Sequence, residues 1–309
     1  MRIKLSVLAV FAAITFLSPM AVFLLEDKQP KADAGLSGTV LKLQNSAEED
    51  AFSVDLNTYL CGALAAEGCA EMEAEALKAM AIVLRTYALK CLQTNPDSPI
   101  VCGSSYWDEQ TQKANWGSDY LTRYNKIASA VRGTDGSVIT YDGDLIVPAY
   151  HKISSGTTES AADMWGRDVP YLIGTSTSFD MLSPHYVSKV SLSPRQIKDR
   201  CEDLNIAFTE SVGDWFGAPV NTAGGSVKSI KLCGTEVAGQ ELAKRLGLAS
   251  PCFTVSVQND SFVFQVLGIG DGVGLSQNGA DYLAGQGKSA DEILAYFYSG
   301  VQIQQEKDF

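Results

Sequence analysis

The sequence predicts an α+β protein in which an N-terminal transmembrane helix precedes a mixed α+β extracytoplasmic domain. Three observations predict this fold class. An uncharged apolar block covers residues 5–25, helix-forming residues run from Glu71 to about Cys91, and β-rich runs bounded by turn signals occupy much of the remaining chain. Within the domain we expect a buried central helix and a smaller α+β lobe.

The apolar block from Leu5 to Leu25 is 21 residues long, which is enough for a helix to span a bilayer core of about 30 Å. Arg2 and Lys4 precede it, and acidic residues follow it at 26 and 27. The positive-inside rule therefore predicts a cytoplasmic N-terminus, a single pass through the cell membrane and an extracytoplasmic domain. The alternative is a cleaved signal peptide, since residues 32–34 read Ala-Asp-Ala.

The anchor prediction divides the chain into three parts. Residues 1–25 form the cytoplasmic tip and the anchor, and residues 26–50, which are polar and contain proline and glycine, form a linker. Residues 51–309 form the folded domain, with residues 187–266 as an inserted α+β lobe. That lobe is expected to contain helices at 194–204 and 239–246, a β-rich run at 226–233 and a hairpin across Asn259-Asp260.

The composition excludes one class of partner and leaves the cysteines open. Lys and Arg number 24 against 36 Asp and Glu, so the net charge is −12, which has the wrong sign for a protein that binds nucleic acid by neutralising phosphates. The seven cysteines do not form a CxxC pair, and their connectivity cannot be deduced from their spacing. We expect most of them to be buried free thiols, with room for one disulfide.

The central helix carries two cations among apolar neighbours. Lys78 and Arg85 are seven residues apart, so they share one helix face with Glu71. Two interpretations remain open. The stripe is either an internal ion-pair ladder, in which Glu71 or Glu75 meets Lys78, or a cationic wall that faces a cleft and orients a catalytic carboxylate.

Two further segments bring polar residues into loops. Residues 137–151 predict a hairpin that turns at Asp142-Gly143 and leads His151 into a polar loop. Residues 268–280 are rich in glycine and enter a helix, so we expect a tight loop whose backbone N–H groups can approach a ligand. The spacing of these glycines is not that of a dinucleotide-binding loop. Ser289 and Glu292 predict a capping box at the start of a last short helix, which we expect to end at Gly300.

The inventory of side chains excludes several kinds of chemistry. The chain has two histidines and no HExxH motif, so a histidine-rich metal site cannot be assembled. A Ser-His-Asp triad through His151 is formally possible, but no G-x-S-x-G motif supports it. Glu67 stands out among the carboxylates because its sequence neighbours are small and apolar. Poor solvation predicts that the pKa of Glu67 rises toward about 6, which suits a general acid, whereas a helix-end glutamate in water is the ordinary alternative.

Ordered motifs spread over most of the predicted domain resemble the stage II sporulation protein D family. They are Glu67, Glu75-Ala-Leu-Lys78-Ala and Arg85-Thr-Tyr87; Val138–Gly143; Tyr150-His151 with Ser154-Ser155-Gly156 and Thr158-Glu159-Ser160; Trp165-Gly166 and Pro170-Tyr171-Leu172; Gly239–Leu248; and Gly272–Ala280. The resemblance implies a membrane-anchored lytic transglycosylase that cuts peptidoglycan glycan strands denuded of stem peptides during engulfment in a spore-forming bacterium. It implies partnership with a sporulation amidase and with membrane proteins of the engulfment machinery.

The resemblance also assigns residues. The catalytic glutamate of the family falls on Glu67, and the remaining motif positions are candidates for lining the glycan groove or holding Glu67: Lys78, Arg85, Tyr150, His151, Ser155, Thr158, Glu159, Ser276 and Gln277. A single carboxyl group suffices for lytic transglycosylation, because the muramic acid 6-hydroxyl replaces water as the nucleophile. No cofactor is expected. Ser155-Gly156 as a simple turn, and Glu159 as a partner of Arg85, are the structural alternatives.

Two departures from the family pattern bear on the site. Asp271 stands where relatives often have a histidine between the glycines, which puts any role of that histidine in doubt here. Some relatives hold zinc through a His/Cys cluster after the long helix, whereas residues 101–107 contain Cys102 and no histidine, so we expect no metal. The rival function from another class is a non-catalytic protein that binds peptidoglycan or stimulates an amidase.

Overall fold

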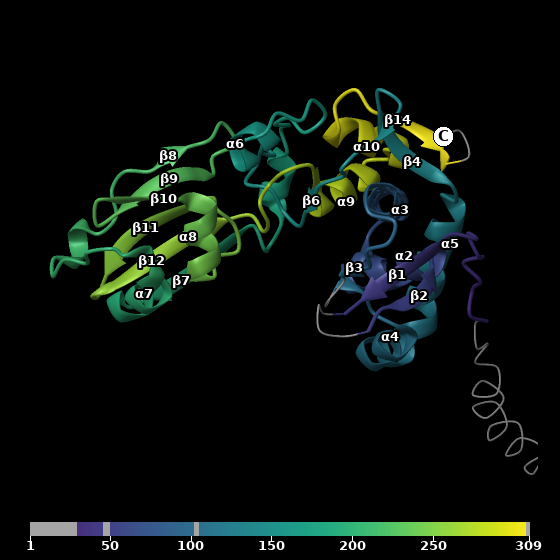
Figure 1. The fold of residues 1–309 in the computed structure, drawn as a ribbon, viewed down its shortest axis with the longest axis horizontal. Coiled ribbons are helices and arrows are strands. Elements are labelled where there is room, and N and C mark those ends of the chain that lie inside the picture. The colour runs from purple at the N-terminus through teal and green to yellow at the C-terminus, as the bar shows by residue number, and fades with distance from the viewer. Residues whose placement is uncertain (1–29, 46–49, 102–104, 307–309) are drawn as a thin grey trace, which may run out of the picture.

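The computed structural model describes residues 30–45, 50–101 and 105–306 (Figure 1). Within these ranges no helix is both long and apolar enough to cross a membrane. The predicted anchor at residues 5–25 lies outside the described residues. The fold itself is mixed α+β, as predicted, and it contains two separate hydrophobic cores.

The two cores define two lobes, which lie side by side in Figure 1. The helical lobe comprises residues 30–186 and 268–306, and the β lobe comprises residues 187–267. The helices of the helical lobe are α2 (Leu56–Ala66), α3 (Ala74–Thr94), α4 (Glu109–Trp116), α5 (Tyr120–Gly133), α6 (Ala161–Trp165), α9 (Gln277–Gly285) and α10 (Ala290–Phe297). Short 3₁₀ turns join them: η1 (Cys69–Glu71), η3 (Gly117–Asp119) and η4 (Ser178–Leu182).

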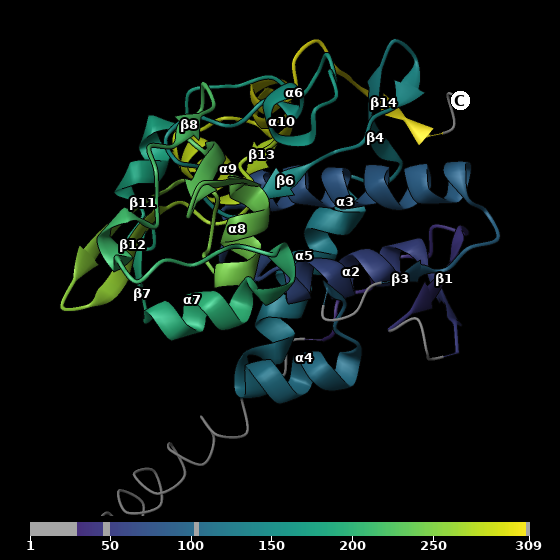
Figure 2. The same cartoon turned by 60° about the vertical axis from the view of Figure 1, so that its left-hand side comes forward.

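The long helix α3 occupies the centre of the helical lobe (Figure 2). Its residues are strong helix formers, and apolar side chains cover most of its circumference, so α2, α5, α9 and α10 all pack against it. The helix begins at Ala74, three residues later than Glu71 where we expected it. Met72 and Glu73 have extended backbone, and the turn η1 separates them from α2.

Strands of the helical lobe form two small sheets and a parallel pair. The sheets have the orders β2-β1-β3 and β14-β4-β5, and β13 pairs with β6. Their strands are β1 (Val40–Gln44), β2 (Phe52–Asp55), β3 (Ile100–Val101), β4 (Ser137–Tyr141), β5 (Asp144–Leu145), β6 (Tyr150–His151), β13 (Leu275–Ser276) and β14 (Gln302–Gln305).

The predictions for two of these regions need correction. Strand β1 lies inside the predicted linker, because Leu41 and Leu43 alternate with polar residues and are fully buried. The turn at Asp142-Gly143 is present, with positive φ at both residues. The second strand of that hairpin, however, stops at Leu145, and Pro148 separates it from β6, which pairs elsewhere.

The β lobe consists of two three-stranded antiparallel sheets with the orders β10-β9-β8 and β11-β12-β7. Its elements are β7 (Val187–Leu192), α7 (Pro194–Arg200), η5 (Glu202–Leu204), η6 (Val212–Asp214), β8 (Val220–Asn221), β9 (Val227–Leu232), β10 (Thr235–Ala238), α8 (Gly239–Leu246), β11 (Phe253–Gln258) and β12 (Ser261–Leu267). The hairpin across Asn259-Asp260 and the helix at 239–246 are present as predicted. Helix α7 is shorter than predicted, because the chain turns into η5 after Arg200.

The last helix and the cysteines can also be compared with the predictions. Ser289 and Glu292 form the predicted capping box of α10, but this helix ends at Phe297, and β14 follows. Six of the seven cysteines are free thiols, namely Cys61, Cys69, Cys91, Cys201, Cys233 and Cys252. Cys102 lies outside the described residues.

Candidate active site around Glu67

Glu67 stands at the C-terminal end of α2, where its backbone N–H still donates to the Ala63 carbonyl. The next residue, Gly68, adopts a left-handed conformation and turns the chain away from the helix. The side chain of Glu67 is 17% exposed. Its carboxylate is therefore largely removed from water but keeps an opening to it.

Three side chains from distant parts of the chain converge on the Glu67 carboxylate. The Tyr150 hydroxyl donates to Oε1 at 3.1 Å, and the Gln277 amide donates to Oε2 at 3.1 Å. Lys152 makes an ion pair with Oε2 at 2.8 Å and also donates to the Glu67 backbone carbonyl at 2.6 Å. The Lys152 ammonium also donates to Gln277 Oε1 at 2.8 Å, so the cluster is continuous.

The pairing of β6 with β13 explains why these residues meet. The two strands run in parallel with Tyr150 opposite Leu275 and His151 opposite Ser276. Ser276 is the N-cap of α9, and its hydroxyl accepts from the Gly279 N–H. Gln277, the first residue of α9, consequently lies next to the end of β6. Figure 1 shows β6 and α9 beside each other.

The electrostatics of the cluster reverse one prediction. Burial alone would raise the pKa of Glu67, as the sequence suggests, but the hydrogen bonds and charge of Lys152, together with Gln277 and Tyr150, hold this pKa below its usual value. The sequence-based expectation failed because it considered chain neighbours only. Burial and the adjacent Glu67 carboxylate raise the pKa of Tyr150, so its hydroxyl remains a hydrogen-bond donor.

A cleft of about 240 Å³ opens beside Glu67 and Tyr150. Two further aromatic side chains contribute to it, Tyr59 from α2 and Tyr87 from α3. The remaining lining residues are Ala63, Leu84, Ile100, Ser105, Val147, Pro148 and Ala149. Among the described residues of this lining, Glu67 supplies the only carboxyl group.

A second group of polar side chains lies beneath the cluster and fixes the start of α9. Asp180, which is fully buried in η4, accepts from the Ser276 hydroxyl at 2.7 Å, from the Asn278 amide at 3.0 Å and from the Ser154 N–H at 2.9 Å. Ser276 therefore acts inside the protein and does not face the cleft. Its bonds position the neighbouring Gln277.

His151 is also internal. Its side chain is buried, its Nδ1–H donates to the Val273 carbonyl at 3.1 Å, and burial lowers its pKa. Its Nε2 has no hydrogen-bond partner among the described residues. A serine nucleophile activated by His151 is therefore not assembled in this geometry.

The glycine-rich loop approaches the protein's own chain, which corrects the prediction that it approaches a ligand. Gly274 has a φ of +76°, and a Cβ there would lie 2.0 Å from the Ala149 carbonyl oxygen. At Gly270, a Cβ would lie 2.6 Å from that of His151. These glycines allow the loop to pack closely against the segment around β6, which brings β13 and Gln277 into place.

Ser155 and Glu159 lie at the junction of the two lobes, whereas Thr158 bonds within the helical lobe. The Ser155 hydroxyl donates to the Gly224 carbonyl at 2.9 Å, and the Thr158 hydroxyl accepts from the Thr175 N–H at 2.8 Å. Glu159 is 1% exposed, and its Oε1 accepts from the Thr222 hydroxyl at 2.8 Å and from the Ser226 N–H at 3.0 Å. Because these bonds lead into the β lobe, Glu159 is not the partner of Arg85.

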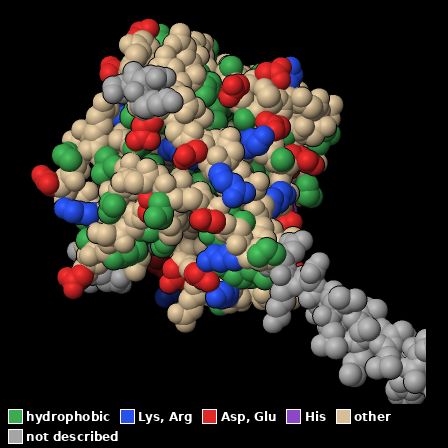
Figure 3. Space-filling view, turned by 90° about the vertical axis from the view of Figure 1, so that its right-hand side faces the viewer, with side chains coloured by type: hydrophobic (Ala, Val, Ile, Leu, Met, Phe, Trp, Pro, Cys, Tyr) green, Lys and Arg blue, Asp and Glu red, His purple; other side chains and the backbone are tan. Residues whose placement is uncertain are grey.

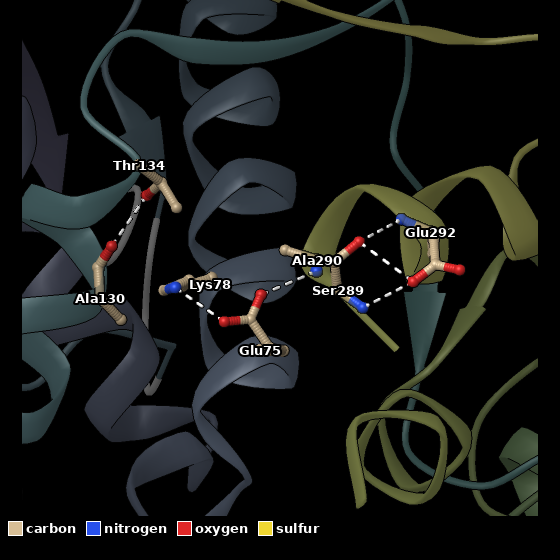
Figure 4. A network of polar contacts seen from close by, with 7 residues as sticks. All are labelled: Glu75, Lys78, Ala130, Thr134, Ser289, Ala290 and Glu292. Carbon is tan, nitrogen blue, oxygen red and sulfur yellow. Dashed lines mark hydrogen bonds and ion pairs between the residues drawn. The ribbon is translucent and has the colours of Figure 1, made fainter. Parts of the chain in front are cut away.

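Lys78 and Arg85 do not join the Glu67 cluster. Lys78 forms an ion pair with Glu75 at 2.7 Å, and Glu75 accepts from the Ala290 N–H at the start of α10, as Figure 4 shows. Arg85 is buried and donates to the carbonyls of Val131, Thr134 and Ser137, where α5 ends. The predicted contact between Glu75 and Lys78 is thus confirmed, although both side chains are 36% exposed and Glu71 pairs with Arg123 instead, and the cationic wall beside the carboxylate is not formed.

Asp271 and the segment at 101–107 are the two departures from the family pattern. The Asp271 carboxylate accepts from the Trp165 indole N–H at 3.2 Å and from the Val273 N–H at 3.1 Å. It therefore stabilises the glycine-rich loop and does not contact Glu67. In the described ranges, no group of three or more His, Cys, Asp and Glu side chains is arranged to hold a metal ion.

Two residues of the site were missed by the sequence analysis, Lys152 and Asp180. A signal existed for Lys152, because side chains alternate along an extended chain and Lys152, which directly follows β6, is two positions from Tyr150. His151, between them, points to the opposite, buried side. For Asp180, which stands in a short 3₁₀ turn, the sequence holds no comparable periodic signal.

Several known proteins are similar to this chain. The family described as "Stage II sporulation protein" matches residues 44–141. Stage II sporulation protein D of Bacillus amyloliquefaciens is 31% identical over 286 residues, covering 90% of this chain and 81% of the relative. The protein of that name from Bacillus subtilis (strain 168) is 29% identical, covering 87% of this chain and 80% of the relative. An amidase enhancer of Bacillus subtilis is 26% identical over 79% of this chain and 40% of its own length. The chain therefore belongs to the stage II sporulation protein D family of sporulation proteins.

Proposed function

We propose that this protein is a lytic transglycosylase that cleaves peptidoglycan glycan strands denuded of stem peptides, leaving 1,6-anhydro-muramic acid ends. The observation that carries the proposal is the lone carboxyl group of Glu67 in an aromatic cleft, held by Tyr150, Lys152 and Gln277. A hydrolase that uses water normally needs two carboxyl groups at the scissile bond, whereas an internal nucleophile needs one.

The first step is protonation of the leaving oxygen. Glu67 transfers its proton to the glycosidic oxygen as the bond from that oxygen to muramic acid C1 breaks. The lowered pKa of Glu67 means that the free protein holds this group mostly as the carboxylate near neutral pH. Sugar rings that cover the carboxylate would remove its remaining water and raise its pKa toward the range of a general acid.

The second step regenerates the acid. Once the leaving sugar has taken the proton, the Glu67 carboxylate accepts the proton of the muramic acid 6-hydroxyl, whose oxygen attacks C1 and closes the anhydro ring. Tyr150 donates to one carboxylate oxygen of Glu67 and Lys152 donates to the other. The carboxyl group therefore keeps one orientation through both steps. Atoms and charge balance without a cofactor, because the proton returns to Glu67.

The location of the protein is part of the proposal. An anchor at residues 5–25 would hold the domain at the outer face of the cell membrane, where it would cut the wall during sporulation engulfment with a sporulation amidase and membrane partners. Basic and acidic side chains are interspersed on the face of the helical lobe that Figure 3 shows. With a net charge of −12, binding to an anionic wall then depends on local contacts in the cleft rather than on general attraction.

The test is the release of peptide-free glycan fragments with 1,6-anhydro-muramic acid ends from denuded strands, measured by mass spectrometry. We expect Glu67→Gln to lower kcat about 10²–10⁴-fold, since it removes the general acid and base while preserving shape. The matched control is Glu236→Gln, an exposed glutamate in the β lobe, which should retain full activity. Absence of anhydro products from the wild type, or equal release by Glu67→Gln, would refute the proposal.

The alternative is a non-catalytic protein that binds peptidoglycan and stimulates an amidase. The relative named amidase enhancer favours it, although the match covers 40% of that protein. The two functions differ in one experiment. A stimulating protein would accelerate the release of stem peptides by a purified sporulation amidase, and its Glu67→Gln variant would accelerate this release equally well. Such a protein would release no anhydro ends by itself.

A further inference from the structure

The cleft at Glu67 continues into a second hollow of about 430 Å³ along α3, which we call the α3 hollow. Tyr87, Ile100 and Val147 line both spaces, so the two form one groove. The other residues around the α3 hollow are Lys90, Cys91, Thr94, Asn95, Ser98 and Pro99. A volume of this order is typical of a ligand site, and of its lining only Tyr87 belongs to the motifs quoted above and no residue belongs to the Glu67 cluster.

The α3 hollow exists because the last part of α3 leaves one face uncovered. Tyr87, Lys90, Cys91 and Thr94 follow the i, i+3, i+4, i+7 spacing, which places them on one side of the helix. The earlier part of α3 is buried on nearly all sides, but here Tyr87 is 40% exposed, and Lys90 and Cys91 are half-buried. The floor of the groove is therefore a continuous helical surface.

The chemistry of the hollow suits a sugar chain with an acidic group. The partly exposed Tyr87 ring offers a flat apolar face, and Thr94, Asn95 and Ser98 offer neutral hydrogen-bonding groups. Among the described residues of this lining, Lys90 is the only cation. Its ammonium donates to the neutral Gln93 amide oxygen at 3.1 Å, and within the described ranges no carboxylate forms an ion pair with it.

We propose that the α3 hollow binds the continuation of the glycan strand beyond the sugar at Glu67, with Lys90 paired to a free lactyl carboxylate of muramic acid. This inference rests on the proposed function and names the feature of the substrate that the groove recognises. An amidase exposes this carboxylate when it removes the stem peptide, whereas an intact stem peptide converts it to a neutral amide. Recognition by Lys90 thus gives a physical basis for preferring denuded strands.

The first experiment compares two substrates with one variant. Denuded strands are compared with the same strands whose lactyl carboxylates have been converted to amides with ammonia and a carbodiimide. We expect the wild type to cleave the acidic strands about two- to fivefold better in kcat/KM, as for a partly exposed ion pair, and Lys90→Gln to show no preference. Lys126→Gln, an exposed lysine on α5 outside both hollows, should keep the preference. A preference that survives in Lys90→Gln would overturn the proposal.

The second experiment measures binding without cleavage, so it stands apart from the proposed function. Cys91 lines the hollow and is half-buried, while burial raises the pKa of Cys61 and Cys69 to about 12 and makes them poor nucleophiles. In the Glu67→Gln protein, we expect denuded strands to slow alkylation of Cys91 by iodoacetamide at least about threefold. Cys233, half-buried in the β lobe, should be unaffected, as followed by peptide mass spectrometry.

The outcomes separate the two proposals. Protection of Cys91 that weakens in Lys90→Gln supports the α3 hollow even if the wild type releases no anhydro ends. Cleavage without protection, and without any effect of Lys90→Gln, would refute the α3 hollow and leave the proposed function standing. Tyr87→Leu, which preserves bulk but removes the flat ring, should weaken protection without altering the melting temperature by more than about 2 °C.

Discussion

The two lobes differ in where they bury polar side chains. The helical lobe contains buried Arg85, His151, Glu159, Asp180 and Gln277, among others, whereas the buried polar residues of the β lobe in the described structure are Ser226 and Ser250. The core of the β lobe is instead aromatic. Burying a polar group is unfavourable unless it is fully hydrogen-bonded. The stability of the helical lobe therefore depends more on buried hydrogen bonds than that of the β lobe does. Part of this buried polar group leads to Glu67, because Asp180 of η4 bonds to the residues on either side of Gln277, and Gln277 donates to Glu67.

The lobes differ equally in how local their contacts are. Both sheets of the β lobe contain hairpins whose partners follow each other in the chain. The Glu67 cluster joins residues that are 83, 85 and 210 positions apart in the sequence. The hairpins of the β lobe are therefore specified by short-range patterns, although β7 also pairs with the distant β12, whereas every contact of the Glu67 cluster is long-range.

Trp215→Ala has the largest expected effect on stability, and it tests whether the β lobe folds as a separate unit. Trp215 is 1% exposed, packs on Phe262 at a centroid distance of 5.2 Å and donates from its indole N–H to the Thr209 carbonyl. We expect Trp215→Ala to lower the free energy of unfolding by about 3–5 kcal/mol. Hydrogen exchange followed by mass spectrometry should show faster exchange at 187–267 and little change around Glu67.

The control for this experiment is Trp165→Ala, because Trp165 is 38% exposed and lies in the helical lobe. Its effect on the free energy of unfolding should be much smaller than that of Trp215→Ala. Uniformly faster exchange in both lobes of Trp215→Ala would show that they unfold together, and the contrast between independent cores would then be lost.

The next effect concerns the junction between the lobes. Glu159 accepts two hydrogen bonds from the β lobe, and its Oε2 has no partner among the described residues. We expect Glu159→Ala to destabilise the protein by about 2–4 kcal/mol, because the Ser226 N–H becomes a buried donor without an acceptor. Glu159→Gln keeps one acceptor oxygen and should cost less than half as much. Thermal unfolding of both variants measures the difference, and equal losses would mean that the hydrogen bonds do not hold the junction.

The same contrast explains what could be predicted from the sequence. The helix at 239–246 and the hairpin at Asn259-Asp260 were predictable because capping and turn residues act over a few positions. Glu67, Tyr150 and Gln277 were identified through ordered motifs, and the structure brings all three together. The pKa direction of Glu67 and the role of Lys152 were not predictable, since both depend on a contact across 85 positions. Strand β1 was missed because its short apolar alternation is hidden in a polar segment.

A smaller effect separates burial from charge at Glu67. Lys152→Met removes the cation but leaves the carboxyl group buried, so the pKa of Glu67 should rise from below to above its usual value. In the wild type, the lowered pKa adds stability above about pH 4.5 that is lost as the pH falls through the folded-state pKa. In Lys152→Met the sign reverses, and the folded state gains stability as the pH falls through the raised pKa. The difference between the two proteins should change by about 1 kcal/mol between pH 7 and pH 4.

Chemical denaturation at several pH values measures this change, and Lys152→Arg, which keeps the charge, is the matched control. Its pH dependence should follow that of the wild type. If Lys152→Met showed the same pH dependence as the wild type, the hydrogen bonds of Tyr150 and Gln277 would account for the lowered pKa by themselves.

The smallest expected effect lies on the surface between the lobes. Lys228 on β9 forms an ion pair with Asp163 on α6 at 3.2 Å, and its side chain is 53% exposed. We expect Lys228→Ala to cost about 0.2–1 kcal/mol, decreasing as salt screens the pair. A double-mutant cycle with Asp163→Asn isolates the coupling, which should be far below the cost of Glu159→Ala. A coupling energy as large as the loss of stability in Glu159→Ala would mean that the surface ion pair, and not the buried carboxylate of Glu159, holds the two lobes together. A small coupling would leave Glu159 as the contact through which the β lobe supports the segment that carries Tyr150 and Lys152.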